Sequence, residues 1–336
     1  MNQPKTIILG PCFLIVLAAA VICPLIGPES ISFKKVFDFS IPMSNNPDAL
    51  IFFRVRLPRC LLAILVGAAL AASGATFQAI LKNPLATPYT LGLSGGSSLA
   101  SLIALTVFGS LSVRFPFLQP MAAFMGALLV LRLVYLLGKR SGMIHNVSLI
   151  LAGVTLNLFF GALILLVQFM ADIGETLFIV HWLMGNIDHA SYTPALILLP
   201  FQAAGLGVLL YHARDMNLIS LDEMSARSLG LDVPRVMKRL YIAATLVAGT
   251  AIAFTGPIGF VGLIIPHALR LLFGADHRLT LPASIMAGGA FLVLCDTAAR
   301  TILAPTELPV GVITALLGGP FFLWLLLRRR YAFSME

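Results

Sequence analysis

The sequence has little charge. Of its 336 residues only 11% are Asp, Glu, Lys or Arg, whereas 59% are hydrophobic. A soluble domain of average composition carries roughly 25% charged residues, and a folded surface in water needs polar cover. This composition therefore excludes a water-soluble globule, and the lipid bilayer is the solvent that suits the chain. We predict one membrane-embedded domain over residues 1–336.

The sequence also lacks the motifs of nucleotide, metal and redox chemistry. It has no GxxxxGK[ST] phosphate loop, so the chain is not expected to bind ATP itself. It has no HExxH pattern and no CxxC pair. Its four cysteines, Cys12, Cys23, Cys60 and Cys295, stand singly in or beside apolar runs, which is typical of buried thiols that pack as small hydrophobic groups. We predict no catalytic residue, no metal site and no cofactor bound by this chain.

Acidic residues are scarce inside the apolar runs, where Asp296 is the one that lies well within a run. Arg300 follows four residues later, which is the spacing of an ion pair on one helix face. A proton-coupled transporter usually needs a chain of embedded ionisable groups, and a membrane enzyme needs a clustered catalytic set, so both are disfavoured. His181 and His189 could contact a metal or haem cargo, although interfacial hydrogen bonding explains them more simply.

Long, continuously apolar runs replace the missing charge, and they predict helices rather than the alternating strands of a barrel. We predict an all-α polytopic membrane protein with about ten transmembrane helices. The first run, after Lys5, is interpreted as a retained span rather than a signal peptide. The eighth is short, and Pro257 and Pro266 are expected to break it. The ten windows are 7–27, 60–81, 90–109, 116–137, 147–170, 194–212, 240–257, 260–274, 280–303 and 308–327.

The net charge of +8 could suggest a nucleic-acid partner, but the basic residues sit mostly in short gaps between apolar runs. Such gaps set the orientation of a membrane protein, because cytoplasmic loops are enriched in Lys and Arg. With the N-terminus placed inside, fourteen Lys and Arg fall on the inner side and seven on the outer side. The outer cluster Arg54, Arg56 and Arg59 runs against this pattern and needs its own explanation. We expect no nucleic-acid partner.

A shift of 182 residues superimposes several glycines and prolines without a gap. Five crossings separate the two copies, about 56–170 and 238–327, so the repeat would be inverted, as in many transporters. The alternative is chance coincidence in a chain with 28 glycines. The matched pairs are Gly67 with Gly249, Gly74 with Gly256, Pro84 with Pro266, Ala86 with Ala268, and Gly92 with Gly274.

The longest polar connection on the inner side covers residues 214–239. Leu218, Leu221, Met224 and Leu229 interleave there with charged residues, which gives a short amphipathic segment. Two interpretations remain open from the residues alone, a solvated loop and a docking surface for a cytoplasmic partner.

Several strings in both halves of the chain resemble the iron-siderophore, haem and cobalamin permease family of ABC importers. The resemblance covers about residues 50–327. In the first half it rests on RLPR at 56–59, LVGAALAASG at 65–74, Gln78, NPLATP at 83–88 and LGLSGG at 91–96. In the second half it rests on GPIGFVGLIIPH at 256–267, Asp296 with Arg300, ELPVG at 307–311 and GGPF at 318–321.

The resemblance implies a homodimer of ten-span subunits in the bacterial inner membrane, with both chain termini in the cytoplasm. Two separate ATPase subunits would bind ATP and Mg below it, and a soluble substrate-binding protein would dock above it. The cargo would be a metal chelate, with ferric siderophore the commonest in the family and haem or cobalamin next. A heterodimer with a paralogue is the alternative to the homodimer.

The resemblance also implies three groups of functional residues. Arg56, Arg59 and Arg300 match arginines that pair with glutamates of the binding protein. Residues 221–231 resemble the coupling helices that contact the ATPase, with Asp222 standing where relatives often have Gly, so that this helix is expected to start differently. The coupling residues are Asp222, Glu223, Ala226, Arg227 and Gly230. The structural and pathway residues are Gly74, Asn83, Pro84, Gly92, Gly256, Pro266, His267 and Asp296.

Overall fold

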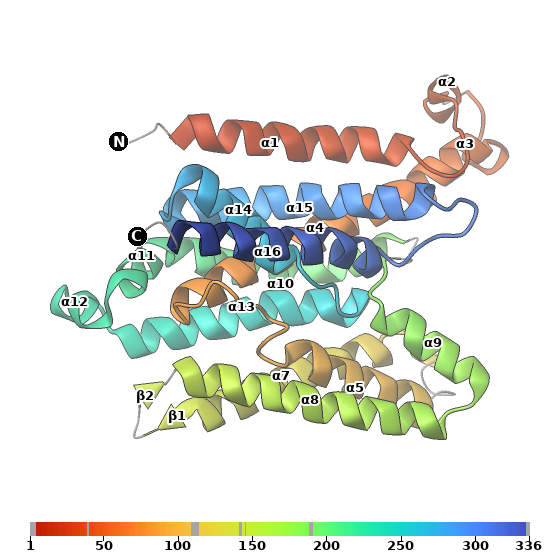
Figure 1. Ribbon diagram of the computed structural model, residues 1–336. Helices are drawn as coiled ribbons and strands as arrows, with labels where there is room; N and C mark the ends of the chain where they lie inside the picture. Colours follow the sequence, from red (N-terminus) through yellow and green to blue (C-terminus); the bar gives the residue numbers. More distant parts are fainter. Residues whose placement is uncertain are drawn as a thin grey trace.

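The computed structural model describes residues 5–38, 40–108, 114–140, 143–144, 146–187 and 191–333. The chain forms a bundle of long helices that lie roughly along one direction (Figure 1). Its long helices are α1 (Lys5–Ile22), α4 (Leu57–Ile80), α5 (Leu93–Val107), α7 (Leu118–Gly138), α8 (Asn146–Met170), α10 (Tyr192–Tyr211), α13 (Val233–Thr255), α14 (Val261–Phe273), α15 (His277–Thr301) and α16 (Val310–Phe333).

Short elements connect these helices. They are the 3-10 turns η1 (Cys23–Leu25) and η2 (Met43–Asn45), α2 (Phe33–Val36), α3 (Pro47–Leu50), the π-helix η3 (Ile51–Arg56), the two-residue strands β1 (Lys139–Arg140) and β2 (Met143–Ile144), α9 (Ile173–Leu183), α11 (Ala213–Leu221) and α12 (Glu223–Ser228). The strands pair antiparallel, with Lys139 opposite Ile144.

Each predicted window overlaps one long helix, and the all-helical membrane class is confirmed. Within the described residues, six helical segments are long and apolar enough to cross a membrane by length and composition. The remaining apolar helices are shorter, so the number of crossings stays a prediction. The six segments are Pro47–Ile80, Leu118–Gly138, Asn146–Met170, Tyr192–Tyr211, Val233–Thr255 and His277–Thr301.

Helices α4, α13 and α15 form the buried centre of the bundle. Small residues let α4 and α15 approach closely, because a side chain at Gly67 would collide with the backbone carbonyl of Gly288. Close approach through small residues is the usual way in which helices associate without a hydrophobic driving force in lipid. This contact fixes α15 against α4 along much of its length.

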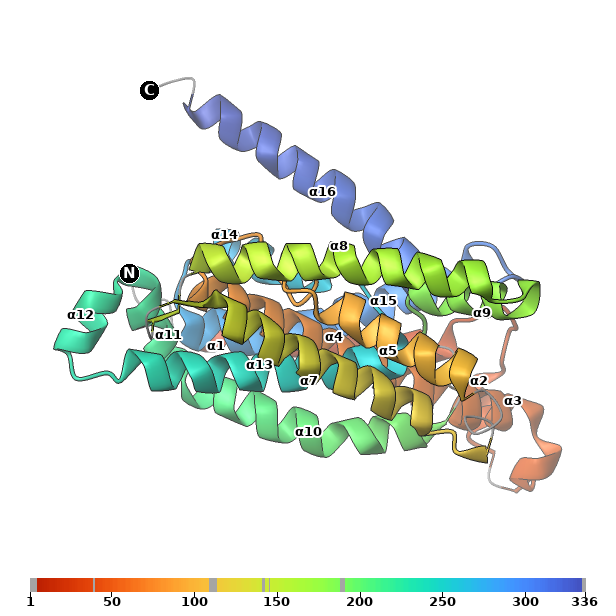
Figure 2. The same ribbon diagram turned by 90° about the horizontal axis from the view of Figure 1, so that it is seen from below.

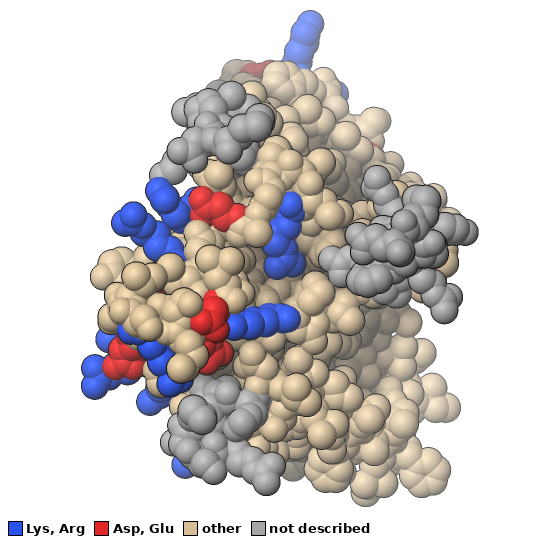
Figure 3. Space-filling model, turned by 60° about the vertical axis from the view of Figure 1, so that its left-hand side comes forward, with Lys and Arg blue, Asp and Glu red and all other residues tan. Residues whose placement is uncertain are grey.

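The two ends of the bundle differ. Helix α1 begins and α16 ends at the end that carries α11, α12 and the β1–β2 pair, whereas α2 and α3 lie at the opposite end (Figure 1). We name these the α12 end and the α3 end. Charged side chains gather around α11 and α12, while most of the remaining surface in the same view is uncharged (Figure 3).

Pro266 does not break its helix, contrary to the prediction, although Pro257 lies in the non-helical link between α13 and α14. A proline inside a helix leaves the carbonyl four residues earlier without its N–H partner. Here that carbonyl belongs to Gly262, and the Gln78 Nε2 of α4 donates to it at 3.0 Å. The neighbouring helix thus replaces the missing bond, and α14 continues to Phe273.

The residues paired by the 182-residue shift differ in local structure. Pro84 lies in the irregular segment 81–92, whereas Pro266 is helical. Gly74 is inside α4, whereas Gly256 follows the end of α13 with a φ of 67°. The inverted repeat stays a prediction, and these pairs do not support it at the level of local structure.

Candidate functional site

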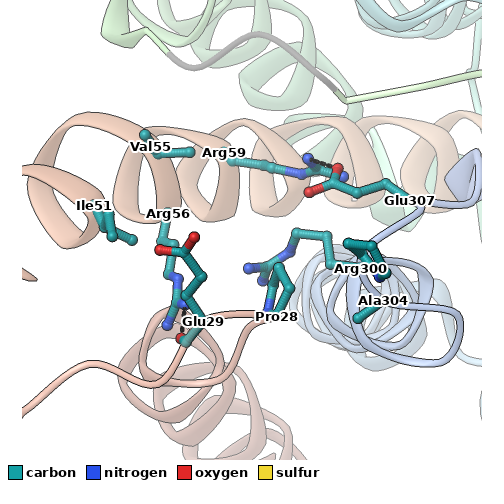
Figure 4. A pocket seen from close by; sticks show the side chains of 10 residues that line it. Pro28, Glu29, Ile51, Val55, Arg56, Arg59, Arg300, Ala304 and Glu307 are labelled. Carbon is teal, nitrogen blue, oxygen red and sulfur yellow. Dashed lines mark hydrogen bonds and ion pairs between the residues drawn. The ribbon is translucent and has the colours of Figure 1, made fainter.

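A cluster of charged residues lies at the α3 end, where the start of α4 meets the end of α15. Figure 4 shows Arg59 pointing toward Glu307, with Arg56 beside Glu29 and Arg300 beside Pro28. The side chains line a cavity of about 570 Å³. We call Arg56, Arg59, Asp296, Arg300 and Glu307 the arginine cluster.

Asp296 joins two of the arginines. Its Oδ1 lies 2.8 Å from Arg59 Nε, and its Oδ2 lies 3.1 Å from Arg300 Nε. The pair with Arg300 has the i, i+4 spacing predicted from the sequence, whereas Arg59 comes from α4. On its far side Arg59 donates through Nη1 to Glu307 Oε2 at 2.6 Å. The cluster therefore connects α4, α15 and the link that precedes α16.

Arg56 and Arg300 hold the segment after α1. Arg56 Nη1 donates to the Leu25 carbonyl at 3.1 Å, and its Nη2 donates to the Glu29 carbonyl. Arg300 Nη1 donates to the Ile26 carbonyl at 3.2 Å. A side chain at Gly27 would displace the Arg56 guanidinium from this position.

The three arginines are buried in the single chain, with relative exposures of 3% for Arg56, 5% for Arg59 and 3% for Arg300. The docking hypothesis took them as an outer surface, and the structure instead places them in the wall of the cavity. Of the two acidic residues of the cluster, Asp296 is buried and Glu307 is accessible, with a side chain that is 39% exposed. Glu307 belongs to the ELPVG string at 307–311, but no sequence pattern indicates that it meets Arg59, so it was not among the predicted site residues.

The predicted coupling segment forms α11, α12 and the turn after them. Asp222 caps α12, because its Oδ2 accepts from the backbone N–H of Ser225 and from the Ser225 hydroxyl, both at 2.8 Å. These bonds, the backbone one first, hold the pKa of Asp222 below its usual range. Where a Gly would only permit the turn, Asp222 therefore also fixes where the helix starts.

The same segment presents apolar and charged side chains to its surroundings. Leu221, Met224 and Leu229 are 83%, 71% and 71% exposed, and Arg227 is also exposed. Glu223 is half-buried, Ala226 packs into the core, and Gly230 ends the turn with a φ of 85°. The segment therefore exposes three large apolar side chains among charged ones at the α12 end of the bundle.

A second, largely apolar cavity of about 720 Å³ lies beside α16 and the link between α13 and α14. Leu85, Tyr89, Phe260 and Leu316 are among its lining residues. Phe260 has a φ of 66°, which is strained for a residue with a side chain, and its ring occupies the space above Gly318. None of the eight predicted structural and pathway residues lines this cavity, although Asn83 orders the turn beside it by accepting from Leu85 N at 2.9 Å.

The remaining predicted residues have structural surroundings. Gly74 packs against Gly262, and Gly92 begins α5 with a φ of 77°. His267 is buried in α14 after Pro266. His181 Nε2 lies 2.6 Å from the Asn186 amide, and His189 lies outside the described residues. Among the described residues no group of three His, Cys, Asp or Glu side chains could hold a metal ion.

The sequence of this chain is similar to those of known transport proteins. The FecCD transport family matches residues 13–328. The hemin transport system permease protein HmuU of Yersinia pestis is 36% identical over 333 residues, which cover 98% of this chain and 97% of the relative. The cobalamin import system permease protein BtuC of Halobacterium salinarum is 40% identical over 299 residues, which cover 88% of this chain and 78% of the relative.

A solved structure of a metal-chelate type ABC transporter in an inward-facing conformation is similar throughout. The TM-score is 0.82 at 33% identity, and the match covers 96% of this chain and 99% of the other. The family match spans most of the chain, and both sequence relatives exceed 30% identity over most of their lengths. This chain therefore belongs to the FecCD transport family.

Proposed function

We propose that this chain is the membrane permease subunit of an ABC importer that carries a metal chelate into the cytoplasm. Ferric siderophore is the first candidate cargo, and haem or cobalamin is the next. The observation that carries the proposal is that two chemically different surfaces lie at opposite ends of one bundle of apolar helices. The arginine cluster lies at the α3 end and the exposed α12 at the other.

The proposed topology has ten crossings, with both termini in the cytoplasm of a bacterial inner membrane. Its support is that α1 begins and α16 ends at the α12 end, beside the charged α11 and α12 (Figures 1 and 3). The shorter apolar helices α1, α5, α14 and α16 supply the crossings beyond the six long segments. Helices shorter than the bilayer are accommodated at modest energetic cost.

Three partners follow from the proposal. Two ATPase subunits would contact α12 at the cytoplasmic end, and a soluble binding protein would insert carboxylates into the cavity of the arginine cluster. A second copy of the chain would pack along α16. The second copy is supported by α16, which diverges from the bundle toward its C-terminal end (Figure 2). Leu316, Leu323 and Trp324 on this helix are more than half exposed.

The test is uptake by proteoliposomes that contain the chain with its cognate ATPase and binding protein. Three radiolabelled chelates are offered, a ferric hydroxamate, hemin and cobalamin, and we expect one of them to be taken up. Its uptake should require ATP on the side of the membrane that carries the ATPase, and a proton ionophore should not change it. Uptake driven by a pH gradient without ATP would instead identify a secondary transporter. Failure of all three chelates to enter while ATP is hydrolysed would overturn the cargo class.

A further inference from the structure

The cytoplasmic surface and the arginine cluster are connected through a single helix. Helix α15 begins at His277 at the α12 end and ends at Thr301 at the α3 end, where it carries Asp296 and Arg300. At a rise of 1.5 Å per residue, the helix separates His277 from Asp296 by roughly 30 Å. A movement at its first turn can therefore reach the arginine cluster without passing through a flexible link.

The side chain of Asn217, on α11, makes two hydrogen bonds to the start of α15. Its Nδ2 donates to Asp276 Oδ1 at 2.7 Å, and its Oδ1 accepts from the His277 backbone N–H at 2.7 Å. Both polar groups of the amide are thus used on the same target, which fixes its orientation as well as its distance. We call Asn217, Asp276 and the His277 N–H the clasp.

The clasp is built into the cap of α15. Asp276 Oδ1 also accepts from the Arg278 N–H at 2.9 Å, so the atom that Asn217 contacts is the one that starts the helix. Partial burial alone would raise the pKa of Asp276, but the bonds from Asn217 and Arg278 outweigh it and lower the pKa. The carboxylate therefore stays ionised and keeps accepting from both donors.

On the other side, α11 continues directly into α12 through Asp222, while Met216 and Ile219 seat α11 on the core. At the far end of α15, Asp296 bonds Arg59 of α4. A continuous path thus runs from α12 through α11, Asn217 and α15 to the arginine cluster. Packed side chains, hydrogen bonds and rigid elements of this kind carry coupling between distant sites.

We propose that Asn217 is the positioning residue that passes movement of α11 and α12 to α15 and so to the arginine cluster. The inference rests on the proposed function, because it takes α12 as the ATPase contact and the arginine cluster as the binding-protein contact. It adds the residue that makes binding-protein docking and ATP hydrolysis respond to each other.

The test compares variants of the assembled complex in nanodiscs, with ATP hydrolysis measured with and without the binding protein. Asn217→Ala should leave complex yield and basal hydrolysis within twofold of wild type. It should lower the stimulation by the binding protein about tenfold, within the usual range of coupling between sites. Assembly and basal hydrolysis of the wild-type complex test the proposed function, whereas the ratio of stimulated to basal hydrolysis tests the clasp.

An exchange of donor and acceptor separates coupling from mere stability. Asn217→Asp alone places two carboxylates together and should abolish stimulation. Asn217→Asp with Asp276→Asn restores the bond in the reverse direction and keeps an acceptor for the His277 N–H. It should recover part of the stimulation, because the amide nitrogen that replaces Asp276 Oδ1 cannot accept from the Arg278 N–H. Such non-additivity is the signature of a direct pair.

Thr280→Val is the matched control, because the hydrogen bond that it removes, to the Asp276 carbonyl at 3.1 Å, lies within the first turn of α15 and does not involve Asn217. It should retain wild-type stimulation. Stimulation that stays within twofold of wild type in Asn217→Ala, or that falls equally in Thr280→Val, would overturn the proposal.

Discussion

At the residue scale, the arginine cluster is an arrangement of buried charge around one carboxylate. Asp296, which is 1% exposed, bonds both Arg59 and Arg300. Buried charges persist in proteins when they are paired and hydrogen-bonded. Because Asp296 holds both guanidiniums from the inside, only their outward-facing atoms can meet a partner, and on Arg59 the Nη1 atom already meets Glu307.

We therefore expect Glu307 to keep its ion pair with Arg59 in the free permease and to be displaced by a carboxylate when the binding protein docks. Glu307→Gln should tighten docking by up to about fivefold, because a partly exposed ion pair contributes about 0.2–1 kcal/mol and the carboxylate of the binding protein would no longer compete with one. The gain should shrink as salt rises. The measurement is the affinity of the immobilised binding protein for the permease complex at two salt concentrations.

Glu29→Gln provides the control for this prediction. It removes one negative charge from the same cavity, but the bond between Glu29 and Arg56 runs through the backbone carbonyl and survives the change. If both variants tighten docking equally, the effect comes from the net charge of the cavity, and Glu307 does not compete for Arg59.

The sequence predicted part of this cluster and missed the rest for a physical reason. The spacing of Asp296 and Arg300 sufficed to predict their pair, because helix geometry is local. The bond from Arg59 joins residues 237 positions apart and depends on the close packing of α4 on α15. Burial of Arg59 depends on the same packing, and burial of Arg56 depends on the segment after α1, which hydropathy does not place.

At the element scale, α14 shows how a neighbouring helix decides whether a proline breaks the chain. The sequence rule that proline ends a helix assumes that the freed carbonyl finds no other donor. In the bundle Gln78 supplies that donor for Gly262, and Arg270 of α14 in turn donates to the side-chain Oε1 of Gln78. The windows for α4 and α14 were predictable from hydropathy, whereas this cross-bond was not, since it joins residues 184 positions apart.

This arrangement predicts a measurable coupling between Gln78 and Pro266. Gln78→Leu should destabilise the protein by about 1–3 kcal/mol, because it leaves the buried Gly262 carbonyl without its donor. Pro266→Ala returns an N–H to α14, so the double variant should be more stable than Gln78→Leu. Recovery should be partial, because the contact from Arg270 is not restored. Unfolding in detergent, followed by circular dichroism, gives the four stabilities of the cycle.

The comparison that decides this prediction is the effect of Pro266→Ala on the free energy of unfolding in two backgrounds, wild type and Gln78→Leu. If the effect is the same in both, the two side chains act independently. Ser284→Ala, which removes a buried hydrogen bond within α15, is the control for the general cost of losing one bond.

At the scale of the whole molecule, we expect a substitution at one end of the bundle to weaken binding of the partner at that end and to leave binding at the other end intact. The arginine cluster and α12 lie at opposite ends, far beyond the distance over which exposed charges interact at physiological salt. Hydropathy and the Lys and Arg distribution predicted this polarity from the sequence, including the position of the charged connection 214–239. Which of its side chains remain exposed required the fold, because Ala226 turns into the core while Met224 turns outward.

Charge reversal in α12 tests this separation. Glu223→Lys with Arg227→Glu should reduce co-purification of the ATPase by about tenfold or more, because like charges set against a complementary partner cost several kcal/mol. Without nucleotide, when no hydrolysis drives movement of α12, binding of the substrate-binding protein to the permease should change less than twofold, since the arginine cluster is untouched. Arg235→Glu, a reversal at a 79% exposed side chain of α13 outside the α12 surface, is the matched control. Loss of both partners together would show that the variant disturbs the bundle as a whole, and retention of the ATPase would move its contact away from α12.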